Sequence, residues 1–322
     1  MLRMHFLNVG HGDCCIIEFP EHITMVDINR SQKMDDKSVK EVISAIKIKH
    51  PDRSLRDFDE NVDDPDMALK EAGYDLKPQD PIQYLEENNI NSFFRFISTH
   101  PHMDHLKDFG KLTESADISN VWIVKNSFGP DKQLQKQSRI SDWDTYVKLR
   151  NSDSTAIKET GTPETDVLRA EENSLDDFYK TDGIKILSPN PELLKTAEDD
   201  DNPNVMSYVL LIEYGPHKIV LGGDAEKENW KYILDQYKDL IKDVTVLKAA
   251  HHGRTSGFYE EAVRHMNPEY TIVSVGNTLK PKVDASQKYK EITRNFLTTR
   301  WKGNIVLECH ENGEINCITQ YN

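Results

Sequence analysis

The feature that most constrains this sequence is a cluster of three histidines and an aspartate within six residues, His100-Pro101-His102-Met103-Asp104-His105. The cluster comes directly after an apolar run at 93–98, which predicts a buried strand. Side chains at the end of a strand are held by the sheet and stay open to substrate. Neutral imidazole and carboxylate suit zinc, manganese or iron, and a turn can direct alternate side chains to two neighbouring ions. The sequence therefore predicts a metal site here.

Two later segments place further potential ligands after apolar runs. Gly222-Gly223-Asp224 follows residues 218–221, and His251-His252-Gly253 follows residues 244–250. Taken alone, an aspartate after two glycines is typical of a turn, and a histidine-rich turn can lie on the surface without a function. Because three such segments each follow an apolar run, we expect them to form one site, in which the Asp224 carboxylate is suited to bridging two ions.

Apolar runs and helical stripes divide the rest of the chain into short elements. We expect strands at 5–19 (two, joined by a glycine-rich bend), 23–27, 121–124, 184–187, 207–213, 218–221, 244–249, 270–275 and 305–309, and helices at 35–50, 81–87, 143–149, 227–237, 258–265 and 286–296. A hairpin turn is expected at Asn312-Gly313. We interpret residues 1–322 as a single α/β domain with insertions at about 51–80 and 121–180, the second being the candidate for substrate selection.

Charge and cysteine content limit the partners and the compartment. A formal charge of −15 argues against nonspecific coating of DNA, which needs an excess of Lys and Arg on at least one face, although a small basic cleft is compatible with it. No apolar window approaches the roughly 18 residues of a membrane span, and no signal peptide is visible. We therefore expect a cytoplasmic protein without membrane association. The cysteines lack zinc-ligand spacing and are expected to be reduced thiols: Cys14, Cys15, Cys309 and Cys317.

The motifs together resemble the metallo-β-lactamase superfamily, and within it the branch typified by the soluble hydrolase domain of the DNA-uptake protein ComEC. The resemblance covers nearly the whole chain. The matching segments are Phe6-Leu7-Asn8-Val9-Gly10-His11-Gly12-Asp13 (VGQGD, with His11 in place of glutamine), Val26-Asp27, residues 98–105 (THxHxDH), residues 204–210 (N-x-x-S), residues 221–224 (LxGD), residues 248–256 (LKxxHHGxxxS) and Ser274-Val275-Gly276-Asn277. This resemblance implies a four-layer αββα sandwich with the metals at one edge.

The resemblance also implies roles for the individual ligands. His100 and His102 would hold one ion, Asp104 and His105 the second, and Asp224 would bridge them. One histidine of the pair at 251–252 would complete the second site. We favour His251, which comes first after the strand, and leave His252 to contact the leaving group or a substrate phosphate; the reverse assignment is the alternative.

Several positions depart from the family pattern or support the ligands from outside. Many relatives carry another histidine between HxHxDH and the bridging aspartate, but His217 lies at a Gly215-Pro216 turn that predicts a hairpin tip. Asn204 and Ser207 are the candidates for that space and for contacts with substrate, so the first ion is expected to bind weakly or to be absent. Asp13 and Asp27 are candidates to orient ligand histidines, although each is equally compatible with a turn or strand-end carboxylate.

The expected reaction is hydrolysis by a hydroxide that two divalent ions, Zn²⁺ or Mn²⁺, generate at neutral pH. The branch resemblance favours a phosphodiester, with Asp104, His252 and Lys248 as catalytic candidates. Further donors for a phosphate are Arg254, Thr255 and Ser256, for which a solvated loop is the competing interpretation. We therefore expect a nuclease or phosphodiesterase acting on DNA or nucleotides.

Two other functions remain open from the sequence. One is a hydrolase of small esters, lactones or thioesters, since fold does not fix function. The other is a non-enzymatic module, against which the intact motifs argue. A protein partner that supplies basic surface would reconcile DNA as a substrate with the acidic charge.

Overall fold

Two β-sheets form the centre of the fold in the computed structural model, which describes residues 1–49, 77–130, 140–151, 166–168, 181–276 and 279–321. The first sheet has the order β14-β13-β1-β2-β3-β4-β5-β6 and the second the order β12-β11-β10-β9-β8-β7. The strands of the first sheet are β1 (Leu2–Phe6), β2 (Cys15–Glu18), β3 (Ile23–Val26), β4 (Ser92–Ile97), β5 (Asp117–Trp122), β6 (Asp166–Leu168), β13 (Ile305–Cys309) and β14 (Ile315–Thr319). Those of the second are β7 (Ile184–Ser188), β8 (Val209–Tyr214), β9 (His217–Leu221), β10 (Val246–Lys248), β11 (Tyr270–Val273) and β12 (Asn295–Thr298).

Both sheets follow the same plan. In the first sheet, β14, β13, β1, β2 and β3 pair antiparallel in turn, and β3 to β6 pair parallel. In the second, β7 to β9 pair antiparallel and β9 to β12 pair parallel. Each sheet therefore has a parallel half, in which neighbouring strands end on the same side and can share a site there.

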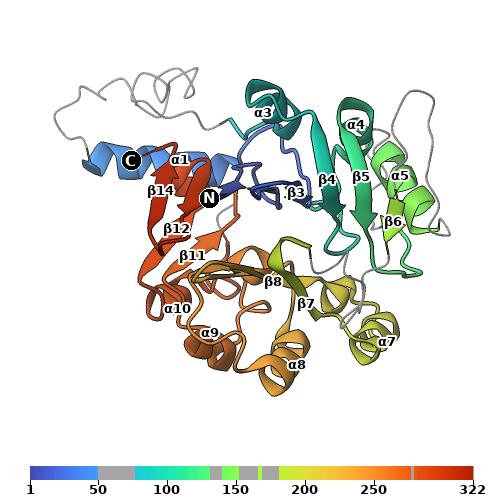
Figure 1. Cartoon of the computed structure of the whole chain (residues 1–322). Coiled ribbons are helices and arrows are strands. Elements are labelled where there is room, and N and C mark those ends of the chain that lie inside the picture. Colours follow the sequence, from blue (N-terminus) through green and yellow to red (C-terminus); the bar gives the residue numbers. More distant parts are fainter. Residues whose placement is uncertain (50–76, 131–139, 152–165, 169–180, 277–278, 322) are drawn as a thin grey trace.

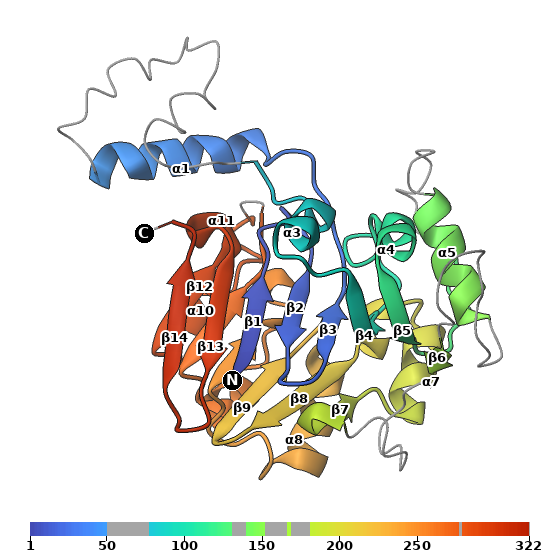
Figure 2. The ribbon, with the colours of Figure 1, turned by 45° about the horizontal axis from the view of Figure 1, so that its top comes forward.

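Helices cover the outer faces of both sheets (Figures 1 and 2). Beside β4 and β5 lie α3 (Pro81–Glu87), α4 (Phe109–Ser115) and α5 (Ile140–Arg150), while α8 (Lys227–Tyr237), α9 (Glu260–Met266) and α10 (Ser286–Lys290) cover the second sheet. The remaining α-helices are α1 (Asp36–Lys49), α7 (Pro191–Asp199) and α11 (Thr299–Lys302). Short 3-10 turns are η3 (Thr181–Gly183), η4 (Pro203–Met206) and η5 (Ala250–Gly253).

Three apolar clusters separate these layers. One lies between the sheets and joins residues such as Met4 and Leu307 to Leu210 and Ile219. A second packs the first sheet against α3, α4 and α5, and a third packs the second sheet against α8, α9 and α10. The predicted four-layer αββα sandwich is confirmed.

The strands carry apolar side chains on both faces because both faces are covered. In β8, Leu210 and Ile212 point into the cluster between the sheets, whereas Val209 and Leu211 point toward the outer helices. This explains the nearly continuous apolar runs in the sequence. It also makes each sheet a rigid support for the loops at its edge.

The predicted helix at 286–296 was wrong in its second half. The helix α10 ends at Lys290, and residues 295–298 form β12, which pairs parallel with β11. Pairing with the open edge of β11 decides the conformation of this short segment, because strand propensity depends on context. The strands β6 and β14 were also not predicted, whereas the turn at Asn312-Gly313 does connect β13 with β14.

The two predicted insertions fall largely on residues outside the described ranges. Within the second, β5, α5 and β6 continue the first sheet and its outer helical layer. All four cysteines are free thiols. In the described part of the chain, no helix has the length and apolar character needed to cross a membrane.

Candidate metal centre

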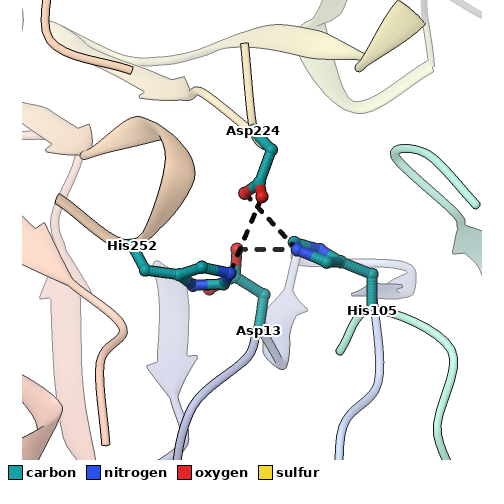
Figure 3. A group of neighbouring side chains, drawn as sticks. All are labelled: Asp13, His105, Asp224 and His252. Carbon is teal, nitrogen blue, oxygen red and sulfur yellow. Dashed lines mark ion pairs between the residues drawn. The ribbon is translucent and has the colours of Figure 1, made fainter. Parts of the chain in front are cut away.

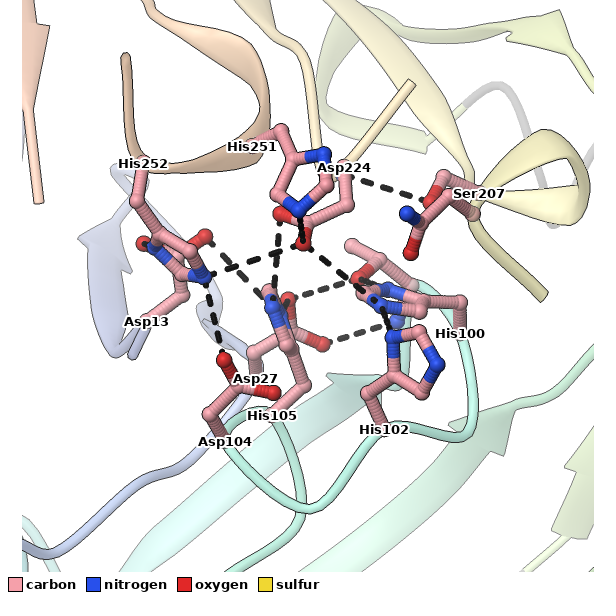
Figure 4. A network of polar contacts seen from close by, with 12 residues as sticks. Asp13, Asp27, His100, His102, Asp104, His105, Ser207, Asp224, His251 and His252 are labelled. Carbon is pink, nitrogen blue, oxygen red and sulfur yellow. Dashed lines mark hydrogen bonds and ion pairs between the residues drawn. The ribbon is translucent and has the colours of Figure 1, made fainter. Parts of the chain in front are cut away.

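The predicted ligands gather at one edge of the sandwich, where strands of both sheets end (Figure 4). The loops come after β3, β4, β9 and β10, together with the β1–β2 loop. Asp27 follows β3, and His100, His102, Asp104 and His105 follow β4. Asp224 follows β9, and His251 and His252 follow β10, whereas Asp13 lies in the β1–β2 loop. The site therefore spans both sheets, and the three predicted segments lie together in it.

Asp224 occupies the middle of this group. Its Oδ1 lies 3.4 Å from Nε2 of His105, and its Oδ2 lies 3.7 Å from Nε2 of His252 and 3.8 Å from Nε2 of His100. The side chain is buried. One carboxylate thus faces ring nitrogens on two sides, which is the arrangement needed to bridge two ions.

The turn before Asp224 explains the need for glycine. Gly223 has a left-handed φ of +49°, and a Cβ there would lie 2.9 Å from the Tyr208 carbonyl oxygen. The backbone N–H of Asp224 donates to the Ser207 hydroxyl at 3.2 Å. Ser207, predicted as a substrate contact, is buried and holds this turn in place.

Three unpartnered atoms lie where His105, His252 and Asp224 could hold the second ion (Figure 3). Nε2 of His105, Nε2 of His252 and Oδ1 of Asp224 are buried and have no hydrogen-bond partner in the described structure. Burying three such groups without partners costs free energy that a bound cation removes. Imidazole and carboxylate are also the donor set that zinc and manganese accept. These residues fit a divalent ion.

In both His105 and His252, the other ring nitrogen, Nδ1, makes a hydrogen bond with the protein. Asp27 accepts from Nδ1 of His105 at 2.7 Å and also from the backbone N–H and hydroxyl of Thr99 at 2.8 and 2.7 Å. Nδ1 of His252 donates to the Ser274 carbonyl oxygen at 3.0 Å. These bonds fix the ring orientation and leave Nε2 directed at Asp224, as is usual around metal-binding histidines.

His100, His102 and Asp224 form a group that could hold the first ion. Nε2 of His100 and Nδ1 of His102 lie 3.0 Å apart, and one atom of each residue lies within 4.8 Å of the Asp224 carboxylate. His217 lies at the start of β9, where Nε2 bonds to the His310 carbonyl oxygen at 2.9 Å. Asn204 donates to Glu226 at 3.1 Å. Among the described residues, the metal-ligand group around His100 contains no third histidine.

The two histidines after β10 differ in their surroundings. Nε2 of His251 also lies 3.7 Å from the Asp224 carboxylate, but its Nδ1 bonds to the Ser256 hydroxyl at 2.8 Å, and the ring is part-exposed. His252 is buried and belongs to two of the ligand groups, whereas His251 belongs to none of those found among the described residues. Both have left-handed φ values, 50° and 53°, which are uncommon for residues other than glycine. Such a turn directs consecutive rings into one site.

Asp13 and Lys248 form a buried ion pair beneath the centre. The Asp13 carboxylate lies 3.8 Å from Nδ1 of both His105 and His252 (Figure 3), and one of its oxygens lies within 4.8 Å of a carboxylate oxygen of Asp224. Lys248 is only 5% exposed. The structure therefore places Lys248 under the ligands, rather than at an open surface where it could meet a phosphate.

The carboxylates and histidines of this site shift each other's pKa. Burial opposes charging of His105 and His252, but Asp224 and the other carboxylates outweigh it and raise the pKa of both rings. Burial likewise favours protonation of Asp224, but His252 and His105 outweigh it and lower the pKa of this carboxyl. These shifts favour an ionised Asp224 and protonated rings of His105 and His252, so a cation bound there would displace protons. Burial instead lowers the pKa of His100.

The remaining predicted contacts lie around the loop after η5. Ser256 bonds to His251, and Thr255 contacts the Lys282 carbonyl oxygen at 3.5 Å. Nη2 of Arg254 lies 3.2 Å from Nε2 of His11. The His11 ring is tilted against the ring of His252, with centroids 4.7 Å apart. In the sequence, His11 is marked only by its departure from VGQGD. Its place in that motif, next to Asp13, was the signal that could have added it to the site.

Fold and ligand arrangement together define the class of the protein. Two face-to-face sheets under outer helices, with HxHxDH after β4, an aspartate after β9 and HHG after β10, make up the metallo-β-lactamase fold with a cluster of His and Asp side chains that could hold metal ions. The resemblance inferred from the motifs is confirmed at this level.

Comparison with known proteins gives one distant curated relative. Over 207 residues, 64% of this chain, the sequence is 24% identical to ComE operon protein 3 of Bacillus subtilis, and the chain spans 23% of the length of that relative. No family model matches. Among solved structures, the chain is similar to the metallo-β-lactamase fold protein YhfI from Bacillus subtilis (10% identity, 99% of this chain and 100% of that one, TM-score 0.46). It is also similar to a metallo hydrolase from Ignicoccus hospitalis (13% identity, 98% of each chain, TM-score 0.44).

Proposed function

We propose that this protein is a metal-dependent phosphodiesterase that acts on DNA or on nucleotides. The observation that carries the proposal is the convergence of three buried, unpartnered ligand atoms on one point, on His105, His252 and Asp224. Asp104, whose carboxylate lies 3.3 Å from Nε2 of His252, belongs to the same place. We assign the second ion to these four residues and the first to His100, His102 and Asp224.

The ions, Zn²⁺ or Mn²⁺, would supply hydroxide at neutral pH and stabilise charge on the attacked group. Other residues of the chain hold the ligand side chains in place and orient them. Asp27 and Ser274 fix the rings of His105 and His252, and the turn at Gly223 fixes Asp224 between the two ion sites. With the ligands on rigid strand ends, substrate can be placed accurately against them.

A phosphodiester is favoured over a carboxylic ester by the charge beside the ligands. The guanidinium of Arg254 lies two residues beyond His252 and, among the described residues, makes no ion pair with a carboxylate. Arg pairs with the oxygens of a phosphoryl group through two parallel hydrogen bonds. The motif resemblance to the ComEC hydrolase domain supports the same substrate class.

The test compares two chromogenic esters. Metal-depleted protein is reloaded with Zn²⁺ or Mn²⁺ and incubated with bis(p-nitrophenyl) phosphate, p-nitrophenyl acetate and, separately, single-stranded DNA. We expect metal-dependent cleavage of the phosphodiester, abolished in Asp224→Asn. Asp117→Asn, an exposed position on β5, serves as the matched control.

Cleavage of DNA would extend the assignment to a nuclease, and a requirement for a further protein would identify a partner. Hydrolysis of the acetate alone, with both ions bound, would instead support the alternative of small esters, lactones or thioesters. That result would overturn the proposed phosphodiesterase function.

A further inference from the structure

Two nitrogen donors beside the second ion site have nothing to bind. Nδ1 of His11 and Nε of Arg254 are both buried, and neither has a hydrogen-bond partner in the described structure. A buried donor without an acceptor costs free energy, and native proteins leave few of them. Two side by side at the edge of a ligand cluster indicate an acceptor that comes with a bound molecule.

The contact between the two side chains identifies the free hydrogen on His11. Nη2 of Arg254 lies 3.2 Å from Nε2 of His11, and a guanidinium can only donate. Nε2 of His11 is therefore the acceptor, and the ring hydrogen is on Nδ1. One ring nitrogen of His11 lies within 4.8 Å of ligand atoms of Asp104 and His252, so the ring borders the second ion site.

The backbone holds His11 firmly in this position. A Cβ on Gly276 would lie 2.2 Å from the carbonyl carbon of Gly10, so the turn rests directly on the segment after β11. The Asn29 side chain donates to the His11 carbonyl oxygen at 2.9 Å. Arg254 is anchored by its own N–H, which donates to the His251 carbonyl oxygen at 2.9 Å. Both donors are thus presented by packed backbone from two different sheets.

The same residues could be taken for a third cation site, because His11, Asp104 and His252 form a possible ligand group. The guanidinium of Arg254 disfavours that reading. It occupies Nε2 of His11, and its positive charge would repel a further cation. Positive charge next to free N–H groups suits an anion.

We propose that His11 and Arg254 form a binding site for the oxygens of a substrate phosphoryl group, beside the second ion. This inference rests on the proposed phosphodiesterase function and adds the residues that select a phosphoryl group. The histidine stands where the ComEC-type motif has glutamine, so the pairing with Arg254 belongs to this chain's own sequence.

The test measures binding of inorganic phosphate, so it does not depend on turnover. The metal-loaded full chain is titrated with phosphate by calorimetry, as wild type, His11→Gln, Arg254→Ala and the double variant. The bound metal of each protein is measured by mass spectrometry. We expect each single variant to weaken phosphate binding about tenfold, and the double variant to lose little more, because the two side chains act together. The matched control Arg264→Ala, an exposed arginine on α9, should bind like wild type.

Three outcomes would overturn the site. They are no phosphate binding by the wild type, unchanged phosphate affinity in both single variants, or a loss of one bound ion in His11→Gln. The last would make His11 a metal ligand. Failure of the phosphodiesterase itself is seen separately, as a metal-loaded wild type that binds phosphate but does not cleave bis(p-nitrophenyl) phosphate.

Discussion

In His105 and His252, Nε2 faces the second ion site and Nδ1 makes a hydrogen bond on the other side of the ring. For His105 this bond is to Asp27, and for His252 it is to the Ser274 carbonyl oxygen. The protein therefore determines the tautomer of each ligand before an ion arrives. Residues that never touch the ion thus control how tightly it binds.

Replacing Asp27 by asparagine tests this control. The amide keeps the shape but loses the charge that orients the His105 ring, so we expect metal affinity to fall by about 10–100-fold. The measurement is competition with a chromogenic chelator, with Asp117→Asn as control. An unchanged affinity would show that the bond between Asp27 and His105 does not support the ligand.

The histidine pair after β10 gives a second prediction. His252→Ala should lose about one of two bound ions, and His251→Ala should keep both, because only His252 has its free nitrogen buried in a ligand group. Mass spectrometry of metal-loaded protein measures the stoichiometry. The reverse pattern would restore the assignment favoured by sequence order.

The sequence predicted which residues lie in the site, but not how their side chains are oriented. The HxHxDH spacing predicted which residues gather, because six consecutive residues after a strand cannot move far apart. It did not predict the directions of the rings at 251 and 252, which depend on two consecutive left-handed backbone conformations. Nor did it predict that Lys248 would be buried against Asp13, which is 235 residues away.

At the scale of elements, the turn between β1 and β2 is locked against the loop after β4. Gly12 has a φ of +142°, and a Cβ there would lie 2.4 Å from the Asp104 carbonyl oxygen. The N–H of Asp13 donates to that same oxygen at 3.1 Å. The glycine of the opening motif is thus explained by close approach of two ligand-bearing loops.

Gly12→Ala should therefore destabilise the fold, by about 1–3 kcal/mol, since the clash is with backbone that cannot move freely. Urea unfolding with and without chelator measures it. Gly129→Ala, where a Cβ would meet nothing within 4 Å, is the matched control. Equal stability of the two variants would contradict the proposed contact.

Elements with a strong local pattern were predicted, and those that depend on partners were not. The helix α8 begins and ends at the predicted residues 227 and 237. By contrast, β12 and β6 are short and take their conformation from pairing with β11 and β5. No local pattern marks such edge strands.

For the whole molecule, the site joins the two sheets, so occupancy by cations should stabilise the complete fold. Ligands that bind only the folded state add about 2.7 kcal/mol at a concentration 100 times their dissociation constant. This gain should depend on pH, because His105 and His252 must release protons when their nitrogens take an ion.

The sign of this dependence follows from the raised pKa of both rings. In the ion-free protein, histidines with a raised pKa stabilise the fold fully below their ordinary pKa of 6.5, and this contribution is lost as pH rises through the raised value. Metal affinity instead rises with pH, because the two rings must lose protons before their nitrogens can bind an ion. We therefore expect the rise in melting temperature caused by Zn²⁺ to grow with pH above about 6.5, and calorimetry in buffers of different ionisation enthalpy should show proton release. A thermal shift independent of pH would contradict this.

The pairing of β1 with β13 has a consequence for synthesis on the ribosome. Arg3 and Glu308, bonded across these strands, are 305 residues apart, so β1 is synthesised long before its partner β13. Until then one edge of β1 is open to pairing with other chains, which is a known hazard for nascent proteins. Metal uptake is delayed in the same way, because His252 leaves the ribosome long after His100. A chain truncated before residue 252 therefore cannot form a complete second ion site.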